Sequence, residues 1–357
     1  MPVVEQLTGR AVVVDGQERL YFSGTSYLGM NANPELAALL QEGGERYGTT
    51  YSSSRASNLK LAVYEEAENM LAAMVGAEAA LTFSSGYMAA QALIRTLDKG
   101  QPFFYAPDAH PALWRTPADA NHTSYTAWVQ SLEERFETVT EEVVLVMNSV
   151  DPLRACKYNF DWVARLPADK QITLVLDDSH GLGVLGEKGA GMYPELKRLV
   201  NSNVRLVLVS SLGKALGIAG GVVMGSEECI ATLRKSLYFV AGSPAPPAYM
   251  HAFVHAGQLY AEARQQLQQN VQAFQELVVH TQLFAYFDTY PVFYTSNHDL
   301  YFDLKDKAII SCFPYPEPNS EPITRIIINS LHTSEDIAQL AEMIGKYSVG
   351  GEVGCKV

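Results

Sequence analysis

The stretch LVLVSSLGKALGIAGG, residues 206–221, raises a chemical question because it places a lysine in apolar surroundings. Lys214 is its one charged residue, and burying an unpaired ammonium group is costly. A surface lysine would simply reach water. A lysine that forms Schiff bases needs a neutral amine, which apolar surroundings favour by lowering its pKa. The second alternative requires partner groups elsewhere in the chain.

Such groups follow the ends of five apolar runs. The run ending at Phe83 is followed by a Ser-Ser-Gly-Tyr sequence, and the other runs are followed by carboxylates, histidines and hydroxyls. The residues are Ser84, Ser85, Gly86 and Tyr87; Asp108 and His110; Asn148, Ser149 and Asp151; Asp177, Asp178, Ser179 and His180; and Ser210, Ser211 and Lys214. One such end would be a simple cap, but five indicate one site.

The elements that must position these residues alternate between strand and helix. Continuous apolar runs predict strands buried on both faces at residues 80–83, 102–105, 143–147, 172–176, 204–209 and 221–224. Helical segments between them, such as 86–97 and 160–166, predict an α/β fold with a mostly parallel sheet. Ligands of such sheets bind outside the carboxyl ends of the strands, where the polar residues stand.

The two ends of the chain predict a second, smaller α/β domain. A hairpin is expected around Asp15-Gly16, helices at 34–46, 59–75 and 248–280, strands at 292–294, 300–304, 309–313 and 323–329, and a helix beginning at Thr333. We therefore predict an N-terminal segment, 1–45, that packs with the small domain; a large domain, 46–245; a linking helix and small domain, 246–348; and a disordered tail, 349–357.

Composition limits the possible partners and location. The net charge is −13 and no Lys/Arg-rich stripe occurs, which argues against nucleic acid and anionic membrane surfaces. No secretion signal and no apolar run of about 18 residues is present. The four cysteines are far apart and form no zinc spacing. These features predict a cytoplasmic protein with reduced thiols, no metal and no membrane span.

Two familiar patterns are interpreted as coincidental. Residues 181–186 match GxGxxG, but a dinucleotide fingerprint begins at a strand end and opens a helix, and here four polar residues intervene. Ser211 and Lys214 match the SxxK of penicillin-binding enzymes, but the SDN and KTG sequences that accompany it are absent. Neither NAD binding nor β-lactam chemistry is expected.

A reactive lysine, carboxylates and a phosphate-binding turn together fit pyridoxal 5'-phosphate (PLP). Asp177, the first residue after its apolar run, is the expected partner of the ring nitrogen. Asp178 points to the other face of the strand and is expected to be structural. The turn at Ser85 and Gly86 either offers free N–H groups to a phosphate or is a plain serine N-cap, and both alternatives stay open.

These residues carry a resemblance to a known family. DDSHGLGVLG at 177–186, followed by SSLGKALG at 210–217, resembles the fold-type I PLP-dependent enzymes of the class I/II aminotransferase superfamily. Within them it is most similar to the α-oxoamine synthases, the group that includes 8-amino-7-oxononanoate synthase and 2-amino-3-ketobutyrate CoA ligase. The resemblance extends from SYLGM at 26–30 to TRIIINSLHTSEDI near the end of the chain.

The resemblance implies specific roles at matching positions. It makes Lys214 the Schiff-base lysine, Asp177 the partner of the ring nitrogen, and His180 a neighbour of the ring hydroxyl. Further implied contacts are His110 on the ring face, Asn148 near the ring hydroxyl, and Ser85, Gly86, Tyr87 and Ser211 near the phosphate or ring. Arg325 would hold the substrate carboxylate, with Ser26 and Tyr27 near the substrate, and Ser243 would reach the site of the partner subunit in a homodimer.

The reaction is where the sequence departs from the family. Ser26 replaces the usual Asn or Asp before Tyr-Leu-Gly, Thr49–Arg55 replaces a glycine-rich turn, Asn148 replaces an acid, and Pro152 stands at a serine position. The first hypothesis is decarboxylative condensation of an amino acid with an acyl-CoA or acyl carrier protein thioester. The second is an aminotransferase, which Asn148 favours. The third is a non-catalytic protein of this fold.

Overall fold

The computed structural model describes residues 3–6, 8–139, 142–315, 317–345 and 347. Its contacts divide the chain into two compact units. The large unit comprises Glu35–Val150 and Tyr158–Gly257. The small unit joins the chain up to Pro34, the segment Asp151–Lys157 and the chain from Gln258 onward. The sequence did not predict that Asp151–Lys157 belongs to the small unit, and the predicted tail at 349–357 lies outside the described residues.

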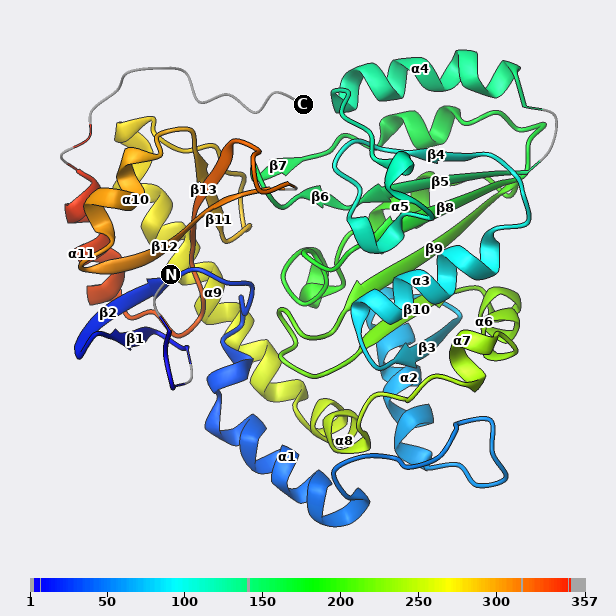
Figure 1. Cartoon of the computed structure of the whole chain (residues 1–357), viewed down its shortest axis with the longest axis horizontal. Coiled ribbons are helices and arrows are strands. Elements are labelled where there is room, and N and C mark those ends of the chain that lie inside the picture. The colour runs from blue at the N-terminus through cyan, green and yellow to red at the C-terminus, as the bar shows by residue number, and fades with distance from the viewer. Residues whose placement is uncertain (1–2, 7, 140–141, 316, 346, 348–357) are drawn as a thin grey trace. The chain divides into compact units, whose positions relative to one another are not determined.

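A six-stranded sheet forms the centre of the large unit (Figure 1). Its order is β3 (Ala79–Phe83), β10 (Gly221–Gly225), β9 (Val204–Ser211), β8 (Ile172–Asp177), β5 (Val143–Asn148) and β4 (Phe103–Tyr105). The last four are mutually parallel, and β10 runs antiparallel to both β3 and β9. The expected α/β class with a mostly parallel sheet is therefore confirmed.

Helices bury the faces of this sheet, which explains its continuous apolar strands. Every residue of β5 is buried. Helix α3 (Gly86–Leu97) packs on β9 and β10, whereas α2 (Ala62–Val75) and α6 (Glu227–Arg234) pack on β3. The other helices of this unit are α1 (Pro34–Tyr47), α4 (Tyr125–Glu137), α5 (Tyr193–Leu199), α7 (Leu237–Val240) and α8 (Pro247–His255).

The small unit has its own five-stranded sheet. Its order is β1 (Ala11–Val14), β2 (Gln17–Phe22), β12 (Ala308–Pro314), β13 (Pro322–Ile327) and β11 (Val292–Thr295). Helices α9 (Gly257–Val278), α10 (Asp299–Leu304) and α11 (Ser334–Ile344) complete it. The short strands β6 (Val150–Asp151) and β7 (Cys156–Lys157) pair with each other in a separate two-stranded sheet.

Two local signals in the sequence are confirmed in this unit. The β1–β2 hairpin turns at Asp15 and Gly16, whose φ angles of 52° and 77° are those of a type I′ turn. The helix predicted to begin at Thr333 starts with a capping box: Thr333 Oγ1 accepts from the backbone N–H of Asp336, and the backbone N–H of Thr333 donates to the Asp336 carboxylate.

Other local predictions were wrong. Residues 300–304, expected as a strand, lie in α10, which Asn297 introduces by accepting a hydrogen bond from the backbone of Asp299. The long helix expected over 248–280 is interrupted between α8 and α9 at Ala256. The segment expected as a helix over 160–166 is a 3₁₀ helix, Asp161–Arg165. Among the described cysteines, Cys229 and Cys312 are free thiols.

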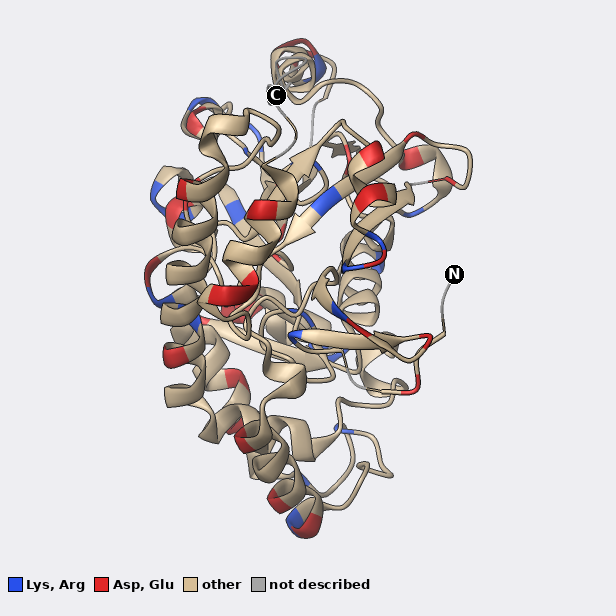
Figure 2. Cartoon of the chain, turned by 90° about the vertical axis from the view of Figure 1, so that its left-hand side faces the viewer, with Lys and Arg blue, Asp and Glu red and all other residues tan. Residues whose placement is uncertain are grey.

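Charges are mixed along the described elements. Figure 2 shows Lys and Arg interspersed with Asp and Glu on the helices and strands in view. Among the described residues, no helix has the length and apolar character to cross a membrane, and no group of three or more His, Cys, Asp or Glu side chains is placed to hold a metal ion.

Candidate active site

The carboxyl ends of β5, β8 and β9 lie side by side in the large unit. The register places Asn148 opposite Asp177, and Asp177 opposite Val209. The segment that follows β8 is linked directly to the end of β9, because the backbone N–H of Ser211 donates to Ser179 Oγ at 2.9 Å. Parallel pairing thus brings together polar residues that are distant in sequence.

Lys214 meets a histidine at this edge of the sheet. Its Nζ lies 2.8 Å from His180 Nε2, and both residues are partly buried. Lys214 stands in a tight turn after β9, in which Gly217 N–H donates to the carbonyl of Lys214 and Leu212 N–H donates to that of Gly220. When the amine donates to His180, the imidazole accepts through Nε2 and carries its proton on Nδ1. The lysine therefore has a polar partner within its apolar segment.

The two neighbouring aspartates point in opposite directions, as expected from strand alternation. Asp177 is partly exposed and accepts a 2.9 Å hydrogen bond from the backbone of Ser179 through Oδ1. Asp178 is fully buried, and burial raises the pKa of its carboxyl group to about 7. Only Asp177 is placed to act at the open edge of the sheet.

His110 belongs to the same cluster electrostatically. Partial burial of the imidazole lowers its pKa, although the residue keeps solvent-accessible surface. The carboxylate of Asp177 raises this pKa, and the charge of Lys214 lowers it. Nδ1 of His110 accepts a 3.1 Å hydrogen bond from the backbone of Ala112, so the neutral ring carries its proton on Nε2. This leaves Nε2–H as the donor of the ring.

Asn148 holds the loop that carries His110. Its Oδ1 accepts from the backbone N–H of His110 at 3.3 Å, and its Nδ2 donates to the carbonyl of Asp108 at 2.7 Å. The loop needs this support because Asp108 has a positive φ of 55°. The amide of Asn148 is thus bonded to the main chain, and its expected contact with a cofactor stays a prediction.

The start of α3 is packed tightly against the strand ends. Ser85 caps the helix by accepting from Met88 N–H at 3.1 Å. A Cβ on Gly86 would lie 2.7 Å from Ser211 Cβ, and one on Gly221 would lie 2.3 Å from the carbonyl of Ser85, so both glycines permit close approach. The Ser85 cap uses the N–H of Met88, so the other N–H groups of the first turn of α3 remain able to bind an anion. Tyr87 is 62% exposed.

Ser243 lies at a cavity that no residue of the strand-end cluster lines. It lines a polar cavity of about 220 Å³ together with residues 50–54 and 240–242. Ser54 Oγ donates to the carbonyl of Val240 at 2.6 Å and closes one side of that cavity. The segment that replaces the glycine-rich turn of the family therefore packs against the segment before Ser243.

The predicted substrate-binding residues all belong to the small unit, whereas every predicted cofactor-binding residue belongs to the large unit. Arg325 is 7% exposed and donates through Nη1 to the carbonyl of Pro152, while its buried Nε has no hydrogen-bond partner among the described residues. Tyr27 is fully buried. Ser26 Oγ donates to Asn31 Oδ1 at 2.6 Å.

Ser179 was missed as a linking residue. Its hydroxyl group joins the segment after β8 to the last residue of β9. The signal available in the sequence was only its place between Asp178 and His180, which does not reveal a partner in another strand. Asp108 was noted, but nothing predicted its left-handed backbone.

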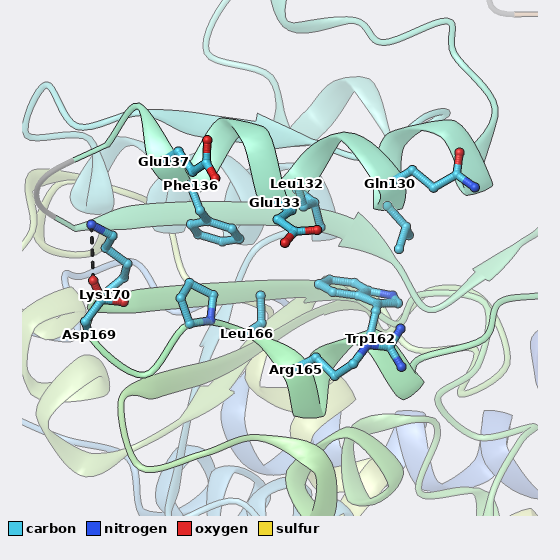
Figure 3. A pocket seen from close by; sticks show the side chains of 12 residues that line it. Gln130, Leu132, Glu133, Phe136, Glu137, Trp162, Arg165, Leu166, Asp169 and Lys170 are labelled. Atoms are coloured by element: carbon cyan, nitrogen blue, oxygen red, sulfur yellow. Dashed lines mark ion pairs between the residues drawn. The ribbon is translucent and has the colours of Figure 1, made fainter.

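A larger cavity in the same unit, of about 620 Å³, is unrelated to this cluster (Figure 3). It lies between α4 and the 3₁₀ helix Asp161–Arg165, with Phe136 and Trp162 in its wall and Glu133, Arg165 and Lys170 among its charged residues. The chain runs from these elements into the amino ends of β5 and β8. No predicted site residue lines this cavity.

The donor set at the strand ends fits PLP. Lys214 supplies an amine beside an imidazole, Asp177 a carboxylate at a strand end, and α3 and Ser211 supply amides and a hydroxyl in one tight cradle. These groups match an aldehyde, a pyridine nitrogen and a phosphate ester respectively.

Comparison with solved structures identifies the class. Serine palmitoyltransferase from Sphingomonas wittichii superposes with a TM-score of 0.81 at 19% identity, covering 97% of this chain and 91% of that chain. 8-Amino-7-oxononanoate synthase from Francisella tularensis superposes with a TM-score of 0.71 at 24% identity, covering 92% and 97%. The fold is that of the fold-type I PLP-dependent enzymes.

The sequence comparison then gives the family. The model for aminotransferase class I and II matches residues 22–344, and this chain belongs to that family. The 8-amino-7-oxononanoate synthases of Pseudomonas syringae and Aliivibrio fischeri are 32% and 31% identical to it over 256 and 268 residues. These alignments cover 68% and 71% of this chain, but only 63% and 67% of the relatives. The resemblance to α-oxoamine synthases is therefore confirmed.

Proposed function

We propose that this protein is a PLP-dependent transferase that condenses an amino acid with an acyl thioester and releases carbon dioxide. The observation that carries the proposal is the 2.8 Å contact between Lys214 Nζ and His180 Nε2 at the strand edge that also holds Asp177. Membership of the family and the similarity to 8-amino-7-oxononanoate synthases support it.

The residues of the large unit divide the binding of PLP among them. Lys214 would hold it covalently, Asp177 would keep a proton on the pyridine nitrogen, and His110 would cover the ring face. The amides at the start of α3, with Ser85, Gly86, Tyr87 and Ser211, would bind the phosphate end. When bound, PLP supplies a store for the electron pair left at the substrate α-carbon.

The reaction then depends on proton transfer and orientation. Lys214, freed by the substrate amine, would remove the α-proton, and His180 would keep its amine aligned. Arg325 would hold the substrate carboxylate through its planar guanidinium. A bond would form from the α-carbon to the acyl carbon, and the C–S bond would break to release a thiolate, which takes a proton from water. The carboxyl group would then leave as carbon dioxide, and the proton held by Lys214 would replace it at the α-carbon.

The proposal includes partners and location. The acyl donor would be an acyl-CoA or an acyl carrier protein thioester. The active form would be a cytoplasmic homodimer. Ser243, which lines the polar cavity at residues 50–54, would reach the partner's site. Sedimentation of the purified protein tests the dimer, and a monomer that is fully active would contradict it.

An absorbance titration tests the reaction. The protein, purified with PLP, is titrated with the common amino acids, and an acyl-CoA series is added afterwards. A synthase is expected to change its visible band with one amino acid and to release free thiol only when the acyl-CoA is present. The control is Lys214→Ala, which must lose the borohydride-reducible linkage between lysine and PLP. A linkage retained at another lysine would contradict the proposal.

The aminotransferase hypothesis gives a different result in the same titration. Conversion of the visible band to that of pyridoxamine phosphate, with release of a keto acid and no need for a thioester, would replace the synthase proposal. Asn148 had favoured this hypothesis, but its side chain bonds to the loop at Asp108 and His110. A PLP-bound protein that turns over no amino acid would favour the non-catalytic alternative.

A further inference from the structure

Asp178 is a buried carboxyl group in direct contact with the loop that carries His180. Its side chain is 0% exposed, and Oδ2 accepts a 2.8 Å hydrogen bond from the backbone N–H of Met192. Ser149 is the other polar neighbour of Asp178, and the Ser149 hydroxyl group lowers the pKa of the Asp178 carboxyl group. However, Oδ1 of Asp178 and Oγ of Ser149 make no hydrogen bond of standard geometry. A carboxyl group in such a place is costly, so its presence requires a reason.

The same residue also holds the other end of this loop. The carbonyl oxygen of Asp178 accepts from the backbone N–H groups of Gly181 at 3.1 Å and Leu182 at 2.8 Å. Its own N–H donates to the carbonyl of Val209 in β9 at 2.9 Å. One residue therefore ties the start of the loop through its main chain and the end of the loop, at Met192, through its side chain.

Two positions in this loop require glycine, because the Asp178 carboxyl group occupies the space that a Cβ would fill. A Cβ on Gly181 would lie 2.1 Å from Asp178 Oδ1, and one on Gly191 would lie 1.9 Å from Oδ2. Gly191 also has a positive φ of 70°, whereas Gly181 does not need one. At Gly181 the requirement for glycine is therefore imposed by Asp178 alone.

The remaining glycines of the GxGxxG match have packing roles too. A Cβ on Gly183 would lie 2.9 Å from that of Ala215, the residue after Lys214. A Cβ on Gly186 would lie 2.4 Å from the carbonyl of Gly191. The pattern that resembles a dinucleotide fingerprint thus folds the loop over Asp178 and against the Lys214 turn.

We infer that Asp178 is a positioning residue whose buried carboxyl group fixes the loop 179–192 and thereby sets the contact between His180 and Lys214. The inference rests on the proposed function only in taking Lys214 as the lysine that binds PLP and removes the α-proton. Asp178 itself need not touch cofactor or substrate. Its effect passes through His180 on one side and through the packing of Gly183 on Ala215 on the other.

A double-mutant cycle on the protein without PLP tests the packing. Gly181→Ala is expected to lower the urea midpoint markedly in the wild-type background, because the new methyl group meets Asp178 Oδ1. In the Asp178→Ala background that oxygen is gone, so the same substitution should have a much smaller effect. Equal effects in the two backgrounds would overturn the packing argument.

A labelling experiment tests the positioning. The pH profile of Lys214 acetylation by acetic anhydride is measured on the protein without PLP, by peptide mass spectrometry, with exposed Lys235 as the internal reference. Asp178→Ala is expected to shift the Lys214 midpoint by about half a pH unit or more relative to Lys235. Asp178→Asn keeps an oxygen acceptor for Met192 N–H and should restore most of the profile.

A matched control separates positioning from general loss of stability. Glu68 is a buried acid of the same unit, paired with Arg55 and Arg234. Glu68→Gln should lower stability without moving the Lys214 profile. The inference is overturned if Asp178→Ala leaves the profile unchanged, or if Glu68→Gln shifts it equally. Because neither experiment uses PLP, failure of the wild-type protein to attach PLP at Lys214 would refute the proposed function alone.

Discussion

Asn148 and Asp177 face each other across β5 and β8 as register partners, but their side chains bond to different parts of the chain. Asn148 bonds to the main chain of the loop before His110, on the β4 side. Asp177 bonds to Ser179 on its own chain segment. One strand end therefore supports a neighbouring loop, while the other presents a carboxylate beside His110 and Lys214.

The Asp177→Asn variant should fold but lose PLP-dependent turnover, because an amide does not stabilise a protonated pyridine nitrogen. It should also lower the pKa of His110 further, since the carboxylate is the group that raises it against the effect of burial. Proton NMR titration of His110 without PLP checks the second effect. An unchanged His110 titration or an active variant would refute this role.

Asn148→Ala should loosen the His110 loop. It leaves the N–H of His110 and the carbonyl of Asp108 without their partner, which costs about 1–3 kcal/mol. We expect faster amide hydrogen exchange at residues 108–110 and weaker binding of PLP. Asn148→Asp keeps the acceptor but loses the donor, so its exchange rates should lie between those of wild type and Asn148→Ala. Exchange at wild-type rates in Asn148→Ala would contradict the assignment.

Asp178 should make stability depend on pH in an unusual direction. Burial raises the pKa of its carboxyl group from 3.8 to about 7, so the folded protein binds this proton more tightly than the unfolded chain. Ionisation of Asp178 therefore favours unfolding. Relative to Asp178→Asn, the wild type should lose about 3 kcal/mol of unfolding free energy as pH rises from about 4 to 7. Urea unfolding across this range measures it; a constant difference would exclude the linkage.

His332 should have the opposite dependence in the small unit. Burial lowers the pKa of its imidazole from 6.5 to about 4. Nδ1 accepts from Asn329 N–H, and Nε2 lies 3.0 Å from the carbonyl of Tyr21, so the neutral ring satisfies both groups. The unfolded chain binds the proton more tightly, and acidification from pH 6.5 to 4 should remove about 3 kcal/mol. His332→Gln should lack this contribution; the same acid sensitivity in both proteins would disprove it.

Arg325→Lys should weaken binding of the amino acid substrate. The guanidinium is nearly buried, with Nη1 bonded to the carbonyl of Pro152, and a lysine cannot match its planar pair of donors. We expect KM for the amino acid to rise about 10- to 100-fold, equivalent to about 1–3 kcal/mol, with kcat changed less. A lowered kcat at constant KM would assign Arg325 to another step.

The sequence predicted the common strand edge of the large unit better than the elements of the small unit. The strand-end residues were found because buried parallel strands are continuous apolar runs, and their carboxyl ends meet at one edge. The strand order and the antiparallel placement of β10 depend on long-range pairing that no local pattern encodes. For the same reason, the bond between Ser179 and Ser211 was not predictable.

The failures have local physical causes. The run at 300–304 is short and apolar, and periodicity alone does not separate a buried strand from a short helix. The Asn297 side chain, which accepts from Asp299 N–H two residues on, was the signal that would have indicated a turn into a helix. The interruption between α8 and α9 stands next to Gly257, a residue that weakens a continuous helix.

The sheet order of the small unit has a consequence for synthesis on the ribosome. Strand β2 is synthesised before the large unit, but its parallel neighbour, β12, is synthesised after it. Until then the hydrogen-bonding groups along that side of β2 lack their final partner, as on any open sheet edge. The large unit, complete once Gly257 has been made, can fold during elongation. The β1–β2 hairpin therefore waits for its β12 partner throughout synthesis of the large unit.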